Sequence, residues 1–300
     1  MFIDREKVNY PVRVLCRVMR VSRSYFYAYL RRRASEDRRR KAEAEMVRKC
    51  FRLNRRRYGS RRIAHKLKMG RFKVRRLMRE IGLVAIQPRR FKPRTTDSGH
   101  DKLISPNLLR EAGLPLTWGD QIVGDITYLP LIGGGFCYLA TFQDRKTKRL
   151  VGWSIDNSMR AELVVKALQM ALRRVLIKRG AIIHTDRGSQ YVSNAYRSLL
   201  ERCGLRQSMS GKGNCYDNAQ AESFFSRFKA ELVTADTHQP IPAFKDLAHA
   251  RQEAFSYIEG YYNRVRLHSA IGYTSPIEFE KELKTKIEKE VNMPDFCVLF

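Results

Sequence analysis

The sequence predicts an α/β fold in which an all-α region precedes a mixed β-sheet. In the first hundred residues apolar side chains recur at helical spacing, whereas from Trp118 apolar and polar residues alternate as they do in strands. Beyond Trp118 three strand-like segments precede a long amphipathic helix, and the order strand, helix, strand, helix follows. Three antiparallel strands continued by strand–helix units are typical of a mixed sheet with helices packed on it.

The amino-terminal helices are expected as short helix-turn-helix pieces. PVRVLCRVMR carries Pro11 in its first turn and apolar residues at helical spacing, and the next helix restarts after Ser22, a residue type that caps helices. The same design recurs in YGSRRIAHKL, a turn at Met69 and Gly70, and FKVRRLMREIGL.

The last of these helices has the pattern of a DNA recognition helix. Its apolar face consists of Val74, Leu77, Met78 and Ile81. Three arginines lie on its other faces, where they can reach phosphates or guanine edges: Arg75, Arg76 and Arg79. A basic helical hairpin with a purely structural role is the alternative.

Charge is distributed unevenly along the chain. The net charge is +29, and residues 1–100 hold 32 Lys and Arg against 8 Asp and Glu, while the other 200 residues hold 27 against 22. This asymmetry indicates a polyanionic partner for the first third, most plausibly nucleic acid. The net charge of +29 does not fit an ordinary metabolic enzyme. A solvated basic tail is the alternative, which the helical spacing of the apolar residues disfavours.

Cysteine and hydropathy patterns exclude several other classes. The six cysteines include no CxxC pair and no signal peptide is evident, which predicts free thiols and a cytoplasmic protein. The histidines lack the spacing of a zinc finger. No run approaches the ~18 apolar residues that span a membrane, so no membrane partner is expected.

Prolines and polar residues between 83 and 117 predict a linker. Four prolines and the run TTDSGH interrupt any regular pattern there. Its basic patch, QPRRFKPR, contains Arg89 and Arg90, which we expect to contact DNA phosphates without reading bases.

Three carboxylates occupy positions that this layout can bring together. Asp125 lies in the middle of the first strand, DQIVGDITYLP, where a buried charge is costly unless it is compensated. Asp186 ends the fourth strand, AIIHTD, and Glu222 lies on the last helix of the series. Such carboxylates can converge at one edge of the sheet, and their oxygens suit Mg²⁺ or Mn²⁺. Two such ions ~4 Å apart can promote attack on a phosphorus atom.

Basic residues near these acids are candidates for DNA contact. Lys229 follows Glu222 by seven residues, which places it about two turns further along the same helix face. Lys212 lies in the GKGN stretch before the helix, where a loop can grip substrate. The alternative is that Glu222 and Lys229 are an ordinary acid and base on a solvated helix edge, without a functional role. His184, two residues before the second acid, is expected to be a packed core residue, with a catalytic role as the alternative.

The spacing of the acids resembles a known motif. Sixty residues separate Asp125 from Asp186 and 35 separate Asp186 from Glu222, with a basic residue seven further on. This pattern resembles the DDE motif of retroviral integrases and bacterial insertion-sequence transposases. In order, WGDQIVGDITYLP, HTDRGSQY, GNCYDNAQAESFFSRFKAEL and YYNRVRLHSAIGYTSPIEF resemble the second-frame (OrfB-type) product of a two-frame insertion sequence. RRRYGSRRIAHKL and VRRLMREIGL resemble its helix-turn-helix region, so the likeness covers roughly residues 10–280.

That resemblance implies a ribonuclease H-like catalytic core with Asp125, Asp186 and Glu222 as ligands of two Mg²⁺ (or Mn²⁺) ions. It implies a transposase that cuts the ends of an element and joins the 3′-hydroxyl to DNA by transesterification. The expected regions are a basic helix-turn-helix DNA-binding region (1–82), a linker (83–117), the catalytic core (118–235) and a C-terminal helical extension (236–300).

The resemblance also implies partners. These are double-stranded DNA, as terminal inverted repeats and as target, in a bacterial cytoplasm at the nucleoid. Because one chain has one active site and an element has two ends, a homo-oligomer is expected. The upstream-frame product of the same element is a further candidate partner.

Other functions stay open at this point. A ribonuclease H-type nuclease would use water and never a DNA 3′-hydroxyl, and a binding-only inhibitor of transposition would bind DNA without forming products. Tyr128 and Tyr191 lie near the acids in sequence, but the Arg and His cluster that a tyrosine recombinase needs is not evident.

Overall fold

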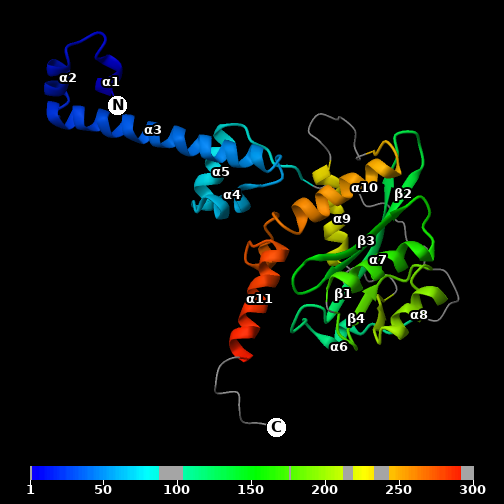
Figure 1. Ribbon diagram of the computed structural model, residues 1–300. Helices are drawn as coiled ribbons and strands as arrows, with labels where there is room; N and C mark the ends of the chain where they lie inside the picture. The colour runs from blue at the N-terminus through cyan, green and yellow to red at the C-terminus, as the bar shows by residue number, and fades with distance from the viewer. Residues whose placement is uncertain (1, 88–103, 176, 212–218, 233–242, 292–300) are drawn as a thin grey trace. The chain divides into compact units, whose positions relative to one another are not determined.

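The computed structural model describes residues 2–87, 104–175, 177–211, 219–232 and 243–291 (Figure 1). The chain divides into two compact units, Met1–Ile86 and Gln87–Phe300. Within the described residues no helix combines the length and the apolar character needed to cross a membrane.

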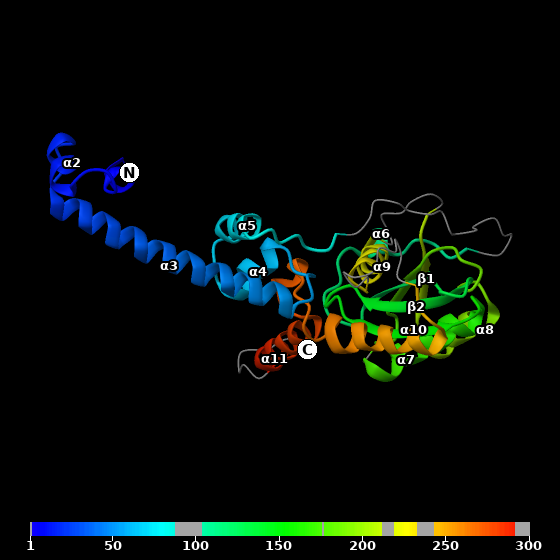
Figure 2. The same ribbon diagram turned by 90° about the horizontal axis from the view of Figure 1, so that it is seen from above.

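The first unit is helical and is organised by one long helix, α3 (Arg23–Leu53). Two short helices pack at its beginning, α1 (Phe2–Glu6) and α2 (Val12–Val18), around a small core of Ile3, Leu15, Cys16 and Phe26. Two more pack near its end, α4 (Ser60–Leu67) and α5 (Arg71–Glu80), as the views in Figures 1 and 2 agree.

The length of α3 corrects the expectation of short helical pieces. The helix begins after the predicted cap Ser22, whose Oγ accepts a hydrogen bond from the Tyr25 N–H at 3.1 Å, and then runs for 31 residues. Residues 31–42 are all exposed and consist of Arg, Lys, Glu, Asp, Ser and Ala. Most of these are good helix formers, and no glycine or proline interrupts them. Because the stretch has no apolar stripe, hydrophobic spacing does not reveal that the helix continues.

The second unit is built on a five-stranded mixed sheet, which confirms the predicted fold class. The strand order is β3-β2-β1-β4-β5. The first three strands are antiparallel: β1 (Gln121–Pro130), β2 (Phe136–Asp144) and β3 (Leu150–Asp156). The other two continue the sheet in parallel with β1: β4 (Ile182–Thr185) and β5 (Arg206–Met209).

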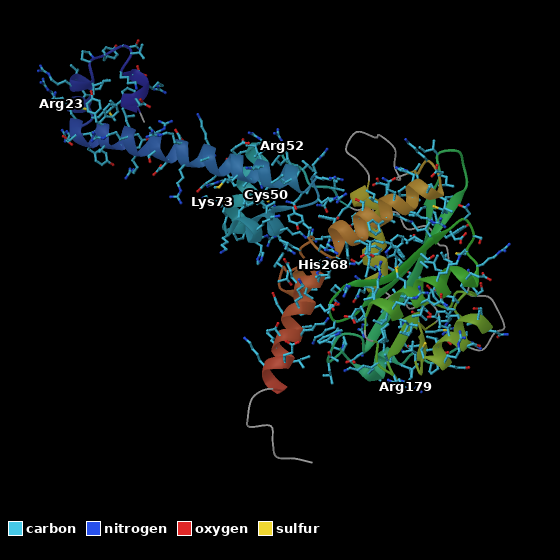
Figure 3. The ribbon with its side chains drawn as sticks, in the orientation of Figure 1. Arg23, Cys50, Arg52, Lys73, Arg179 and His268 are labelled. Carbon is cyan, nitrogen blue, oxygen red and sulfur yellow. The ribbon has the colours of Figure 1, made fainter. Side chains whose placement is uncertain are left out.

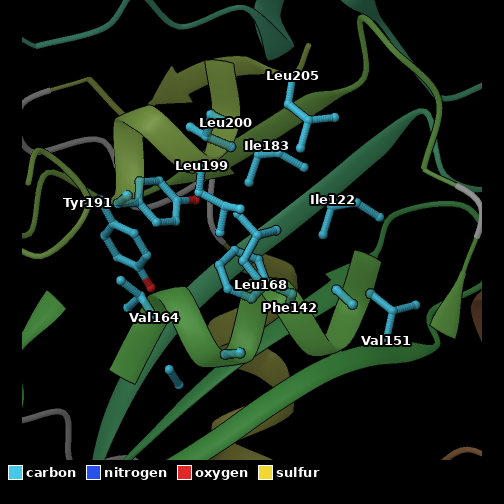
Figure 4. Close-up of a cluster of buried hydrophobic side chains, with 14 of the residues drawn as sticks. Ile122, Phe142, Val151, Val164, Leu168, Ile183, Tyr191, Leu199, Leu200 and Leu205 are labelled. Atoms are coloured by element: carbon cyan, nitrogen blue, oxygen red, sulfur yellow. The ribbon is translucent and has the colours of Figure 1, made fainter. Parts of the chain in front are cut away.

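One face of the sheet is covered by α7 (Ala161–Arg174) and α8 (Asn194–Arg202). Figure 4 shows the apolar side chains that meet there, among them Phe142, Leu168 and Ile183. The long amphipathic helix of the sequence is α7, which ends at Arg174, since Val175 is buried in an extended conformation (φ −135°, ψ 140°).

The other face is covered by α9 (Ala219–Leu232), α10 (Leu247–Phe255) and a π-helix, η1 (Ser256–Tyr262). An aromatic cluster fills this layer: Phe224, Phe225, Phe228, Tyr257 and Tyr262. The chain then passes through a 3₁₀ turn, η2 (Ser269–Ile271), into α11 (Pro276–Val291).

The segment before β1 packs on the edge of the sheet. It contains one short helix, α6 (Leu109–Ala112). The Ser105 hydroxyl donates to Gln207 Oε1 and the Leu108 N–H donates to Ser208 Oγ, both at 2.9 Å. Residues 104–112, which composition places in a linker, therefore lie against β5.

Candidate active site

The sheet register brings Asp125 and Asp186 to the same place. β1 and β4 pair in parallel, with Val123 opposite His184. Continued by two residues, this register sets Asp186, the residue after β4, opposite Asp125. Because side chains alternate along strands, residues two apart lie on the same face, so both carboxylates lie on the face that carries Val123.

Glu222 reaches the same face from α9. The preceding residue, Ala221, packs with Val123 and Ile182 of the two strands. Glu222 itself is partly buried, and its charge acts on Asp125. The fold thus groups the three acids that sequence spacing singled out.

The electrostatics of this group are dominated by crowding of negative charge. Burial and the nearby Asp186 raise the pKa of Asp125 well above its usual value, and Glu222 adds to the rise. The Ile126 N–H, which donates to Asp125 Oδ1 at 2.8 Å, and the Lys229 ammonium oppose it. Carboxylates that repel one another in a partly buried site favour either a proton or a bound cation.

A glycine shapes the turn around Asp186. The Gly188 N–H donates to Asp186 Oδ1 at 3.0 Å. A Cβ at position 188 would lie 2.9 Å from Gln190 Oε1 and 3.1 Å from Asp186 Oδ1. Any larger residue here would therefore crowd the carboxylate.

Lys229 lies beside the acids, as its helical spacing predicts. Its Nζ is 4.1 Å from the centroid of the Tyr128 ring, a cation–π contact. Burial lowers the pKa of Lys229 to about 8, while Asp125 acts in the opposite direction. Lys229 therefore places a positive charge close to Asp125.

Tyr191 and His184 have structural surroundings. Tyr191 is fully buried, and burial raises the pKa of its hydroxyl well above the usual value, which argues against a nucleophilic role. His184 is fully buried between the hydroxyls of Ser208 and Ser210, at 2.8 and 3.1 Å. The expectation of a packed histidine is confirmed.

Two sets of contacts that sequence reasoning missed hold α9 in place. At its beginning, Gln220 accepts a hydrogen bond from Lys148 Nζ at 2.8 Å and donates to the Asp144 carbonyl at 3.1 Å. Near its end, Glu231 forms a buried ion pair with Arg266 at 2.7 Å and accepts from the Tyr257 hydroxyl at 2.8 Å. Only the three-dimensional contacts reveal these partners, since they lie far away in sequence.

Apart from Lys229, the residues predicted to bind DNA fall into two groups. Arg75, Arg76 and Arg79 are exposed on α5, while Val74 and Leu77 of the same helix are buried, as the recognition-helix pattern predicts. The other three candidates lie outside the described residues: Arg89, Arg90 and Lys212.

The donor set of the acids has the chemistry of a site for a hard cation, since it offers only carboxylate oxygens. In the described part of the chain, no three Asp, Glu, His or Cys side chains are arranged as ligands of one ion. The acids are neighbours around Asp125 without forming a closed cage.

Comparison with known families agrees with this fold. Residues 118–215 and 203–276 match families that are each described as "Integrase core domain", and residues 36–91 match an "HTH-like domain". The chain is therefore an enzyme of the integrase-core class, the DDE-type polynucleotidyl transferases.

Curated relatives define the family more closely. "Transposase InsF for insertion sequence IS3A" of Escherichia coli (strain K12) is 36% identical over 290 residues, 94% of this chain and 98% of the relative. "Insertion element IS600 uncharacterized 31 kDa protein" of Shigella sonnei is 36% identical over 274 residues, 89% and 98% of the two chains. The chain belongs to the OrfB-type DDE transposases of the IS3 family of insertion sequences.

Solved structures of retroviral integrases are more distant. The HTLV-2 integrase catalytic core domain in complex with magnesium (dimeric form) aligns with 55% of this chain and 98% of its own, at 12% identity and a TM-score of 0.40. A score at that level adds nothing to the family assignment.

Proposed function

We propose that Asp125, Asp186 and Glu222 hold two divalent ions, Mg²⁺ or Mn²⁺, with which the transposase cuts element ends and joins them to DNA. The observation that carries this proposal is the grouping of three partly buried carboxylates, from β1, from the residue after β4 and from α9. Asp125 is the central member, since both other acids act on its charge.

The raised pKa of Asp125 supports cation binding, because a group of ionised carboxylates is relieved by positive charge. When bound, two divalent ions supply activation of the attacking hydroxyl and stabilisation of the leaving oxygen. The chain's own part is to hold the three carboxylates in register through the sheet and α9. The Ile126 and Gly188 N–H groups orient the Asp125 and Asp186 oxygens.

The two chemical steps balance without another reactant. In the first, water replaces the 3′-oxygen at a phosphodiester and leaves a DNA 3′-hydroxyl. In the second, that hydroxyl attacks a target phosphodiester, forms a new ester bond and releases the target's own 3′-hydroxyl. Each step exchanges one P–O ester bond for another P–O bond, and the proton lost by the attacking oxygen is returned to the leaving oxygen through solvent.

We assign the basic residues to the DNA strands around this chemistry. Lys229, which lies beside Asp125, contacts the DNA backbone close to the reacting phosphate. The exposed arginines of α5 bind the terminal inverted repeat, and Arg89, Arg90 and Lys212 are further candidates for phosphate contact. The enzyme acts as a homo-oligomer on two element ends and a target, in the bacterial cytoplasm, and the upstream-frame product is a candidate partner.

Joining of labelled duplex ends to a plasmid in Mg²⁺ or Mn²⁺ tests this function. The wild-type chain, with its upstream-frame partner where one is encoded, is compared with Glu222→Gln. Glu201→Gln is the matched control, since Glu201 is exposed on α8. We expect the wild type and Glu201→Gln to join 3′ ends, and Glu222→Gln to bind DNA equally but to join at least ~100-fold more slowly.

Other outcomes lead to other functions. Metal-dependent cutting by the wild type without joining would identify a hydrolytic nuclease. Binding without any product, even with the partner, would identify a binding-only inhibitor.

A further inference from the structure

The first unit contains the helix-turn-helix design twice. A constant offset of 48 residues relates the two copies: α2 begins at Val12 and α4 at Ser60, while α3 begins at Arg23 and α5 at Arg71. We call residues 12–31 the first head and residues 60–79 the second head. The match to the HTH-like domain covers residues 36–91, which includes only the second head.

The turns of the two heads have the same backbone geometry. Arg20 and Lys68 occupy equivalent positions and are both left-handed, with φ of 53° and 51°. Each turn closes with one N–H donating to the carbonyl five residues back and one to the carbonyl three residues back, a Schellman-type helix end. These bonds are Val21 to Cys16 (2.9 Å) and Arg20 to Arg17 (3.1 Å), matched by Met69 to Ala64 (2.9 Å) and Lys68 to His65 (3.2 Å).

The buried positions also correspond. At the offset of 48, side chains that fill the core of the first head match side chains that fill the core of the second. The pairs are Leu15 and Ile63, Cys16 and Ala64, and Phe26 and Val74. The two heads therefore correspond in their buried side chains as well as in the positions of their helices.

The outward face of the first head is basic. Arg23, Tyr27 and Arg31 of α3 are exposed and stand where α5 has Arg71, Arg75 and Arg79, which are also exposed. The two acids that precede the first head, Asp4 and Glu6, are already in ion pairs. Asp4 pairs with Lys7 and Arg33, and Glu6 pairs with Arg5. The exposed arginines of the first head therefore face solvent as net positive charge, which complements a polyanion.

The helix α3 fixes the distance between the heads. Phe26 anchors it in the first core, and Cys50 is buried 24 residues later beside α4 and α5, a separation of about 36 Å at 1.5 Å per residue. Figure 3 shows Arg23 towards one end of α3 and Cys50 and Arg52 towards the other. One turn of B-DNA is about 34–36 Å, so the spacing matches successive major grooves.

We propose that the first head is a second DNA-reading surface, so that the first unit contacts one duplex at two places about one helical turn apart. The proposal rests on the proposed function, because the duplex in question is an element end. It assigns Arg23, Tyr27 and Arg31 to one contact and Arg71, Arg75 and Arg79 to the other.

Footprinting of the full chain on labelled element ends tests the proposal. We expect two protected stretches whose centres lie about 10–11 base pairs apart. Arg23→Ala/Arg31→Ala should abolish protection of one stretch only, and Arg71→Ala/Arg75→Ala protection of the other. Arg38→Ala/Lys41→Ala is the matched control, since it removes the same charge from exposed positions in the middle of α3, and it should keep both stretches.

A change in the length of α3 gives an independent test. Seven residues inserted after Ala34 add two helical turns, about 10.5 Å, with little rotation, and should move the stretches apart by about three base pairs. A single protected stretch, unchanged protection by Arg23→Ala/Arg31→Ala, or unchanged spacing after the insertion would overturn the proposal. It would also be overturned if Arg23→Ala/Arg31→Ala altered only the oligomeric state, since the surface would then bind protein.

Joining measured on the same samples separates this inference from the proposed function. A wild-type chain that protects two stretches but joins no ends would refute the transposition chemistry and leave the second reading surface standing. A chain that joins ends but protects only one stretch would refute the second reading surface and leave the transposition chemistry standing.

Discussion

The two units of this transposase differ in how deeply they bury ion pairs. In the first unit the side chains of the ion pair Arg40–Glu80 are 54% and 31% exposed, whereas in the second unit those of Arg266–Glu231 are 3% and 4% exposed. Exposed pairs contribute ~0–1 kcal/mol and are screened by salt, while a buried pair is costly to break. The first unit thus keeps its charge at the surface for a partner, and the second buries charge to hold α9.

The strongest test of this contrast is Arg266→Met. The substitution leaves Glu231 buried without its cation, so the free energy of unfolding should fall by ~3–5 kcal/mol. Urea or thermal denaturation of the full chain measures the change. The double variant Glu231→Leu/Arg266→Met removes both charges and should recover most of the loss. A loss below ~1 kcal/mol in the single variant would show that the pair does not hold α9.

The other end of α9 should affect metal use more than stability. Lys148→Met removes the hydrogen bond to Gln220, two residues before Glu222, and so loosens the helix turn that carries this acid. We expect the Mg²⁺ concentration for half-maximal joining to rise about 10–100-fold. The free energy of unfolding should change by only ~1 kcal/mol.

Calorimetric titration of Mg²⁺ into the protein provides a readout that does not depend on joining. Lys146→Met is the matched control, because Lys146 lies in the same turn. If both lysine variants behave alike, the contact with Gln220 does not position Glu222.

In the first unit a surface arginine should act on DNA binding and leave stability unchanged. Arg75→Ala should lower the slope of log affinity against log salt by about 0.9, the value for one lost phosphate contact. Arg76→Ala should have a smaller effect, because Arg76 already faces Glu80 at 3.8 Å. Salt titrations of binding to a labelled duplex measure both slopes. Equal slopes for Arg75→Ala and the wild type would show that Arg75 does not contact a DNA phosphate.

The smallest effect concerns the two ion pairs of Glu43 on α3 and their pH dependence. Lys73, at 2.6 Å, and Arg39, at 3.1 Å, lower the pKa of Glu43 below its usual 4.5. A lowered pKa in the folded state means that the stabilisation is present above pH 4.5 and is lost as the pH falls through the folded pKa. Glu43→Gln should therefore cost ~0.5 kcal/mol at neutral pH and almost nothing at about pH 3. Denaturation at both pH values checks the sign, and a larger cost in acid would contradict it.

Local pattern predicts the positions of the acids well. Asp125 stands out because a charge in an apolar strand needs compensation, and the spacing to Asp186 and Glu222 resembles a known motif. The order of strands and helices follows from periodicity, and the structure confirms the mixed sheet. Hydrophobic periodicity therefore predicts the order of strands and helices along the chain.

Periodicity in the sequence does not predict contacts between residues that are far apart along the chain. Lys148 and Gln220 are 72 residues apart and Glu231 and Arg266 are 35 apart, and no local pattern pairs them. The continuity of α3 was missed for a different reason, because its middle is exposed and lacks the apolar stripe on which helix prediction depends.

The π-helix η1 decides which changes of chain length the attachment of the C-terminal region tolerates. Its wider turns put one more residue into each turn than an α-helix does, and they end where Asn263 exchanges hydrogen bonds with Leu150 of the sheet, at 2.9 and 3.0 Å. Loss of a single codon within Ser256–Tyr262 would remove that extra residue and allow an ordinary α-helix that ends in nearly the same direction, whereas gain of a codon would turn everything after it by about 100°. After such a gain, Asn263 and Arg266 would point away from their partners. A one-residue gain within η1 would thus release the contacts that hold α9, whereas loss of one residue or most point substitutions there would not.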